Sequence, residues 1–259
     1  MHLNIEVQLD YQIDTPIDLI LQIQAPSFAD QSVVHENLDL GDLQQIARVA
    51  AEAGMGERSL LKTSGDLSCI YTAKLDVKRP ELDISTLPAV AVHHLPGDAV
   101  RYLMPSRFCP ADQLQSFVAA EFSRYHGGAR IAAMRDWVFK RFRYVAGSST
   151  AQTTAIYTFV QRQGVCRDFA HVLITLARAS AIPARFASVY APSVTPQDFH
   201  AVVEVFLDGT WHLVDATGMA RADEIVRIGV GLDAAEVAFL SGFGPMTLRS
   251  QTVSVAVAG

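Results

Sequence analysis

Residues 164–171 read GVCRDFAH and continue into an apolar segment, VLITLAR, at residues 172–178. The spacing of the apolar positions predicts a helix whose first residue is Cys166. A cysteine there lies at the positive end of the helix dipole, where free N–H groups favour the thiolate form. Gly164 permits a close approach of the chain, and Asp168 can accept hydrogen bonds from donors at the helix start. The segment therefore predicts a rigid helix that presents a reactive thiol.

The sequence around this helix predicts an α+β fold. The helix is expected to end near residue 181, because Ile182 precedes Pro183 and the residue before a proline disfavours helix. Apolar residues at helical spacing predict three earlier helices, and the segments after residue 183 predict strands that Asp208-Gly209 joins into a hairpin. The predicted helices cover residues 111–125, 131–142, 150–161 and 166–181, and the predicted strands cover residues 184–190, 199–207 and 210–215. Helices followed by an antiparallel sheet are typical of the α+β class.

The first hundred residues predict antiparallel β structure. Residues 2–13 alternate between apolar and polar positions, which is the pattern of a half-buried strand. Residues 63–66 are turn formers and predict a hairpin between strands at 58–62 and 67–77. Residues 43–53 have helical spacing, but a surrounding sheet could make them a strand.

A change in the sequence pattern near Arg107, from a proline-containing connector to helical periodicity, predicts a boundary between two domains. The connector before it, residues 79–106, contains several prolines, and helical periodicity begins directly after it. We therefore predict an N-terminal β domain with its connector at residues 1–106 and a helix-rich domain at residues 107–259. The alternating tail, residues 246–257, predicts a closing strand.

Composition and charge exclude several classes of function. The chain of 259 residues has a net charge of −6 and no long run of lysine or arginine, which argues against a nucleic-acid partner. Its apolar stretches are shorter than the ~18 residues of a membrane span. Residues 1–10 lack the apolar core of a secretory signal. We therefore expect neither a membrane partner nor export.

The cysteine count argues against a structural role for these residues. Cys69, Cys109 and Cys166 form neither an even set nor a Cys-x-x-Cys motif, so we expect no disulfide framework and no structural zinc site. No calcium-binding loop of the DxDxDG type is present. The sequence thus predicts a cytoplasmic protein with reduced thiols, no metal and no cofactor.

A thiolate nucleophile needs a base, and the base needs a partner that orients it. His200 begins a predicted strand directly after a loop, and Asp215 ends the next strand. The turn at residues 208–209 would place His200 opposite residue 217 and Asp215 opposite residue 202. The two side chains are then neighbours on one face at the open end of the hairpin, about two residues out of direct register. A small register shift or bulge would bring the carboxylate to the imidazole.

Other polar residues have simpler structural explanations. His171 is five residues from the helix start, about 140° around the helix from the cysteine, and is expected to be structural. His93 and His94 are adjacent, so in a strand their side chains would point in opposite directions, which disfavours a metal site. Cys69 and Cys109 are expected to be inert.

Four segments, in this order along the chain, resemble the bacterial transglutaminase-like family, a group of cysteine peptidases with a papain-like core. The segments are GVCRDFAH (164–171), AIPARF (181–186), FHAVVEV (199–205) and WHLVDAT (211–217). The resemblance covers about residues 107–218. It implies a catalytic triad of Cys166, His200 and Asp215 and an N-terminal β domain.

By this resemblance, the expected reaction is acyl transfer from a peptide or another amide substrate. The thiolate of Cys166 would attack the carbonyl group, and its backbone N–H would supply half of an oxyanion hole. His200 would protonate the leaving group and then activate water or an amine, while Asp215 fixes its tautomer. Gln161 and Gln163 are candidates for the second oxyanion donor.

Three functions remain open at this point. The leading prediction is a cysteine peptidase or amidase, and the second is a transglutaminase, in which an amine accepts the acyl group. The third is a binding or scaffold protein with a vestigial triad. Val202 and Ala216 stand where the family commonly has tryptophan and proline, and Ala181 stands where it commonly has glycine. These differences concern the substrate groove and keep the third possibility open.

Overall fold

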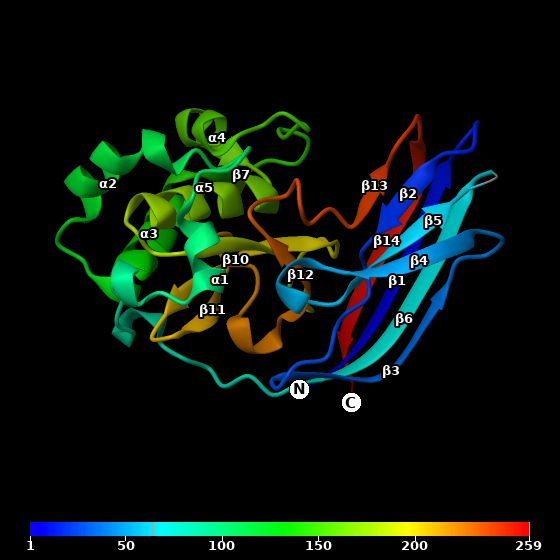
Figure 1. The fold of residues 1–259 in the computed structure, drawn as a ribbon, viewed down its shortest axis with the longest axis horizontal. Coiled ribbons are helices and arrows are strands. Elements are labelled where there is room, and N and C mark those ends of the chain that lie inside the picture. The colour runs from blue at the N-terminus through cyan, green and yellow to red at the C-terminus, as the bar shows by residue number, and fades with distance from the viewer. Residues whose placement is uncertain (64, 259) are drawn as a thin grey trace.

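The computed structural model describes residues 1–63 and 65–258. The architecture is α+β, as predicted. Helices gather on one side of the molecule and long strands on the other, with a smaller sheet between them (Figure 1). Within the described residues, no helix combines the length and apolar character needed to cross a membrane.

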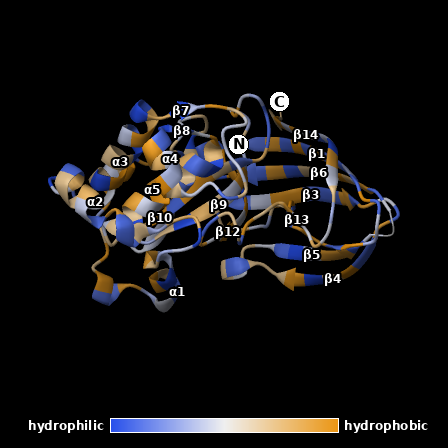
Figure 2. Ribbon diagram, turned by 90° about the horizontal axis from the view of Figure 1, so that it is seen from above, coloured by the Kyte–Doolittle hydropathy of each residue, from blue (hydrophilic) through white to orange (hydrophobic). Residues whose placement is uncertain are grey.

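Two four-stranded sheets form what we call the β region. One has the strand order β14-β1-β6-β3 and the other β13-β2-β5-β4, and they appear as two layers in Figure 2. The strands are β1 (His2–Gln12), β2 (Asp18–Leu21), β3 (Gln31–Asp39), β4 (Gln44–Ala50), β5 (Glu57–Lys62), β6 (Leu67–Val77), β13 (Leu240–Gly242) and β14 (Thr247–Val257). The alternation predicted for the first strand is confirmed, because Leu3, Ile5, Val7 and Leu9 are at most 2% exposed. These side chains lie in a hydrophobic core to which both sheets contribute.

Two expectations about the β region are settled by strand pairing. Residues 43–53, which fitted either element, contain strand β4, because the backbone there pairs with β5. The predicted hairpin between β5 and β6 is wrong. Strand β5 pairs with β2 and β4, whereas β6 pairs with β1 and β3, so the chain passes from one sheet to the other. Of the predicted turn, residue 64 lies outside the described residues.

The end of the chain returns to the β region. Strand β14 pairs along its length with β1, and β13 pairs with β2. The prediction of a strand at residues 246–257 is therefore confirmed, and this strand, β14, belongs to a sheet of the β region. The predicted domains, residues 1–106 and 107–259, assigned this tail to the second domain. We propose a boundary near Arg107, with β13 and β14 belonging to the β region.

The middle of the chain forms helices that pack on an antiparallel sheet of order β11-β10-β9-β12. The helices are α1 (Gly97–Val100), α2 (Gln115–Phe122), α3 (Gly127–Arg141), α4 (Ala155–Gln161) and α5 (Cys166–Ala179). The strands are β7 (Arg143–Tyr144), β8 (Gln163–Gly164), β9 (Ala184–Tyr190), β10 (His200–Leu207), β11 (Thr210–Val214) and β12 (Val226–Gly231). Strand β12 escaped prediction because its two glycines weaken the strand pattern.

Helix α5 is the central helix of this half. Its residues 168–178 are all buried, and Val172, Leu173 and Leu176 are 0% exposed. They share a core cluster with side chains of α3, β9 and β10. Because buried apolar contacts surround the helix, its first residue is held in a fixed position.

Helix α5 ends in a Schellman turn with alanine at the position that usually holds glycine. The N–H of Ala181 donates to the carbonyl of Arg178 (2.9 Å), and the N–H of Ile182 donates to the carbonyl of Ala177 (3.1 Å). The φ angle of Ala181 is 60°, in the left-handed region. A Cβ atom in this conformation costs roughly 1 kcal/mol relative to glycine.

We expect Ala181→Gly to raise the free energy of unfolding by about 1 kcal/mol and Tm by roughly 2–4 °C. The side chain is exposed, so its removal loses little packing. Differential scanning calorimetry measures the change. Ala179→Gly, within the last helical turn, is the matched control and is expected to lower stability. A loss of stability in both variants would contradict the assignment of strain to Ala181.

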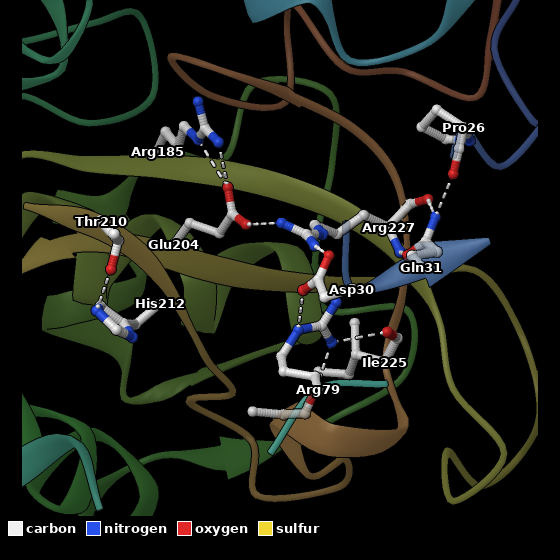
Figure 3. Close-up of polar contacts among 11 residues, drawn as sticks. Pro26, Asp30, Gln31, Arg79, Arg185, Glu204, Thr210, His212, Ile225 and Arg227 are labelled. Atoms are coloured by element: carbon white, nitrogen blue, oxygen red, sulfur yellow. Dashed lines mark hydrogen bonds and ion pairs between the residues drawn. The ribbon is translucent and has the colours of Figure 1, made fainter. Parts of the chain in front are cut away.

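A chain of buried and partly buried ion pairs joins the β region to the sheet of the second half (Figure 3). Glu204 of β10, 0% exposed, accepts hydrogen bonds from Arg185 of β9 (2.7 Å) and Arg227 of β12 (3.2 Å). Arg227 also pairs with Asp30, and Asp30 pairs with Arg79 at 2.7 Å. Asp30 precedes β3 and Arg79 follows β6. Separating the two halves would leave buried charges without their partners, which costs several kcal/mol. These ion pairs therefore hold the two halves in one relative position.

Candidate active site

Cys166 is the first residue of α5, and the local sequence explains how it is held. The preceding residue, Val165, is extended, and its N–H donates to Oδ2 of Asp168 at 2.9 Å. Oδ1 of the same carboxylate accepts a hydrogen bond from Ser149 at 2.9 Å. A Cβ atom on Gly164 would lie 2.6 Å from the Cβ of Asp168, so this position requires glycine. The close approach at Gly164 and the capping role of Asp168 are both confirmed.

The hairpin that carries the other two predicted residues has the expected register. Val203 pairs with Val214, which is the pairing that a turn at residues 208–209 dictates. The pairing continues without a bulge and ends there. Beyond Val214 the chain leaves the strand, and Oδ2 of Asp215 lies 3.0 Å from Nε2 of His200. The end of the strand, rather than a register shift, brings the two side chains together.

The carboxylate of Asp215 is buried and fully hydrogen-bonded. Its Oδ1 accepts from the N–H and the hydroxyl of Thr217, both at 2.7 Å, and its Oδ2 accepts from the N–H of Ala220 at 2.9 Å. Burial by itself would raise the pKa of Asp215, but the bonds from His200 and Thr217 and the neighbouring imidazole lower it. The side chain is therefore an anion fixed in one orientation.

His200 lies between this carboxylate and the thiol of Cys166. The imidazole is 2% exposed, and burial alone would lower its pKa. Hydrogen bonding and charge from Asp215 and Cys166 outweigh burial and raise the pKa of His200 to about 9. Since Nε2 contacts Asp215, Nδ1 is the ring nitrogen left for Cys166. At neutral pH the ring is therefore mostly an imidazolium.

The thiol of Cys166 is partly exposed and opens on a pocket that it shares with His200. The structure therefore brings together all three residues predicted for the site. The other two cysteines lie elsewhere, because Cys69 and Cys109 are both 0% exposed in the hydrophobic cores. Burial raises the pKa of each of these two thiols to about 12.

Tyr144 is a neighbour of Cys166 that sequence reasoning missed. Strand β7 pairs in parallel with β8, and Tyr144 lies opposite Gly164, two residues before the thiol. Burial, followed by the charge of Cys166, raises the pKa of Tyr144 to about 12, although a hydrogen bond with the backbone of Cys166 acts in the opposite direction. Gln161, by contrast, is exposed at the end of α4. The two-residue strand carries no periodic signal, so only the pairing reveals the tyrosine.

His171, the histidine of helix α5, has a structural environment. His171 is 0% exposed and packs against Phe108 and Phe186, with ring centroids 5.2 and 5.3 Å away. Burial lowers the pKa of His171 to about 3, so the ring is neutral and structural, as predicted. Among residues 1–63 and 65–258, no group of three or more histidine, cysteine, aspartate and glutamate side chains is arranged to hold a metal ion.

Comparisons with known proteins identify relatives of this chain. Residues 114–216 match the transglutaminase-like superfamily. The crystal structure of a proposed cysteine protease from Cytophaga hutchinsonii is 33% identical and has a TM-score of 0.91, over 99% of this chain and 90% of that chain.

Two uncharacterized mycobacterial proteins are also similar. The one from Mycobacterium leprae is 24% identical over 149 residues, which is 54% of this chain and 53% of that protein. The one from Mycobacterium bovis is 25% identical over 135 residues, which is 46% of this chain and 43% of that protein. The chain thus spans about half the length of the curated relatives that it matches. With a structural relative that matches nearly the whole chain and a superfamily match over the segment that holds Cys166, His200 and Asp215, the chain belongs to the transglutaminase-like superfamily.

Proposed function

We propose that this protein is a thiol-dependent acyl-transfer enzyme, most simply a cysteine peptidase or amidase that acts on a peptide-like amide. The observation that supports the proposal is the spatial arrangement of a thiol, an imidazole and a carboxylate. A partly exposed thiol at a helix start, Cys166, opens on the same pocket as a buried imidazole, His200, which a fixed carboxylate, Asp215, holds at 3.0 Å. Nucleophile, base and orienting group in this order are the requirements of covalent acyl transfer.

The three residues have distinct roles in the proposed reaction, and His200 acts in both of its steps. The sulfur of Cys166 attacks the carbonyl carbon, forming a C–S bond while the carbonyl oxygen takes up the electron pair. His200 gives its proton to the leaving nitrogen as the C–N bond breaks, which leaves a thioester. The neutral imidazole then takes a proton from water, and the resulting hydroxide attacks the thioester. The C–S bond breaks, the carboxylic acid leaves, and Cys166 and His200 return to thiolate and imidazolium. Asp215 holds the ring in orientation throughout.

The proposed oxyanion hole combines a backbone and a side-chain donor. Cys166 is the first helical residue, and an N–H group in the first turn has no partner within the helix. The hydroxyl of Tyr144, which lies beside the same residue, can supply the second donor. Tyr144 replaces the sequence-based candidates, Gln161 and Gln163, in this role.

Tyr144→Phe is expected to lower kcat by roughly 10²–10³-fold with little change in KM, because an oxyanion donor acts mainly on the transition state. Steady-state kinetics on any peptide that the protein hydrolyses measures the effect. Tyr157→Phe, which removes a hydroxyl from an exposed tyrosine of α4, is the matched control. Equal activity of the two variants would remove Tyr144 from the oxyanion hole.

Peptide hydrolysis and amine transfer are separated in one assay. The full chain is incubated with a peptide mixture and a labelled primary amine, and mass spectrometry identifies the products. New peptide ends without label are the expected result, whereas label on glutamine side chains would indicate a transglutaminase. Neither product above the background of Cys166→Ala would point to the binding-protein alternative.

Val202 and Ala216, two of the three residues that depart from the family pattern, do not line the site. Val202 is 0% exposed and Ala216 is 1% exposed, each within a hydrophobic core. Neither lines the pocket that Cys166 and His200 share. The departures therefore affect packing behind the triad, which supports the enzymatic alternatives over a vestigial site.

A cytoplasmic location is part of the same proposal. The three cysteines are all free, and the proposed chemistry needs Cys166 as a reduced thiol. Reducing compartments keep thiols in this form.

A further inference from the structure

The pocket beside Cys166 has a size and lining that suit one side chain. Its volume is about 220 Å³, which is below the roughly 300–1,000 Å³ of pockets that hold drug-sized ligands. Apart from the thiol and the imidazole, most of its wall is apolar. The other polar residues of the wall are Arg167 and Ser188, and the apolar lining consists of Phe186, Phe199, Ala201, Ala234, Val237, Ala238 and Phe239.

The single permanently charged residue of the lining is already engaged. Arg167 donates through one terminal nitrogen to Ser149 at 3.1 Å and to the carbonyl of Thr150. Its guanidinium carbon lies 5.4 Å from the ring centroid of Phe108. The loop before α4 and this ring therefore engage one side of the Arg167 guanidinium, whereas its Nε has no hydrogen-bond partner within the described part of the chain.

The far wall of the pocket comes from the segment after β12, residues 234–239. Phe239 stacks on Phe199, the residue before His200, with a centroid distance of 4.2 Å and an interplanar angle of 5°. Strand β5 of the β region and the turn after α1 hold this segment in place. Arg58 donates to the carbonyl of Glu236 at 2.7 Å, and Arg101 donates to its carboxylate at 3.1 Å. The shape of the pocket is thus fixed from outside the helical half.

We propose that this pocket selects the substrate by receiving one uncharged apolar side chain, aliphatic or of phenylalanine size, from a residue next to the cleaved bond. The inference rests on the proposed function, because the pocket opens directly on Cys166 and His200. An aliphatic or aromatic side chain gains the free energy of apolar burial there. A carboxylate, an ammonium group or a glutamine amide would lose its hydration there, and outside the Cys166–His200 pair only Arg167 and Ser188 could compensate for part of the loss. The pocket therefore favours cleavage of the peptide backbone beside an apolar residue over reaction at a glutamine side chain.

The test is a cleavage-site profile of the full chain. An equimolar mixture of blocked peptides presents every residue type on both sides of a peptide bond, and mass spectrometry counts the cleaved bonds. We expect leucine, isoleucine, valine, methionine or phenylalanine at one adjacent position, at least tenfold more often than aspartate, lysine or glutamine. Cleavage without such a preference overturns the pocket assignment alone. No cleavage above the Cys166→Ala background overturns the proposed function and this inference with it.

Two substitutions at Ala238 link the preference to the pocket. Ala238→Phe fills the space and is expected to lower cleavage beside leucine and phenylalanine about tenfold or more, while cleavage beside alanine is retained. Ala238→Arg adds a free charge and is expected to move the preference towards aspartate and glutamate. Ala235→Phe, in the same segment but exposed and outside the pocket, is expected to keep the parent profile. An unchanged profile in both Ala238 variants contradicts the proposal.

Discussion

Cys166→Ala is expected to lose turnover by a factor on the order of 10⁶, which removes measurable peptide hydrolysis. The substitution deletes the sulfur that forms the acyl intermediate and leaves a water-exposed position without a nucleophile. Stability is expected to change little, because the side chain is only partly buried and makes no structural hydrogen bond within α5. Steady-state hydrolysis and thermal unfolding, measured on the same preparations, separate loss of chemistry from loss of fold.

Cys69→Ala is the matched control for this result. Cys69 is 0% exposed in strand β6, and burial raises the pKa of its thiol to about 12, so it has no part in the proposed reaction. The control is expected to retain turnover while losing some stability through the cavity that it leaves. Hydrolysis that survives in Cys166→Ala would show that the nucleophile lies elsewhere.

Asp215→Asn is expected to lower kcat by about 10⁴-fold while the fold persists. An amide can occupy the same space, but it lacks the negative charge that helps to raise the pKa of His200 and does not favour the required ring tautomer. Asp112→Asn changes an exposed carboxylate in the same half and is expected to retain the parent kcat.

The pH dependence gives a second readout of the same variant. The pKa of His200 is about 9, so the imidazolium is present below this pH and is lost as the pH rises through it. Activity of the parent protein is therefore expected to decline above about pH 9. In Asp215→Asn the decline should begin at lower pH, because the charge that stabilises the imidazolium is gone. An alkaline limb at the same pH in both proteins would contradict the role of Asp215.

Local patterns in the sequence predicted the helix that carries Cys166 and the hairpin that carries His200 and Asp215. The helix start follows from apolar spacing, and Gly164 and Asp168 act within four residues of the thiol. The hairpin register follows from a two-residue turn, which fixes every opposite pair. These features depend only on residues close together in the sequence, so the sequence alone was enough to predict them.

The parts that could not be predicted depend on contacts between distant segments. Strand β14 pairs with β1 across almost the whole length of the chain, and β5 and β6 enter different sheets although they are close in sequence. Tyr144 reaches the site through a two-residue parallel pairing. The pocket wall at Phe239 exists because the β region binds the segment before it. No periodicity in the sequence encodes these partners.

The most direct test of the account is the rate at which each cysteine of the native protein reacts with iodoacetamide at about pH 6, where an ordinary thiol is almost fully protonated. Peptide mass spectrometry reports Cys166, Cys69 and Cys109 separately in one sample. The account predicts fast, selective labelling of Cys166 that falls sharply in His200→Ala. Labelling of Cys166 no faster than that of Cys69, or labelling that the loss of His200 leaves unchanged, would contradict a thiol activated by the imidazole beside it.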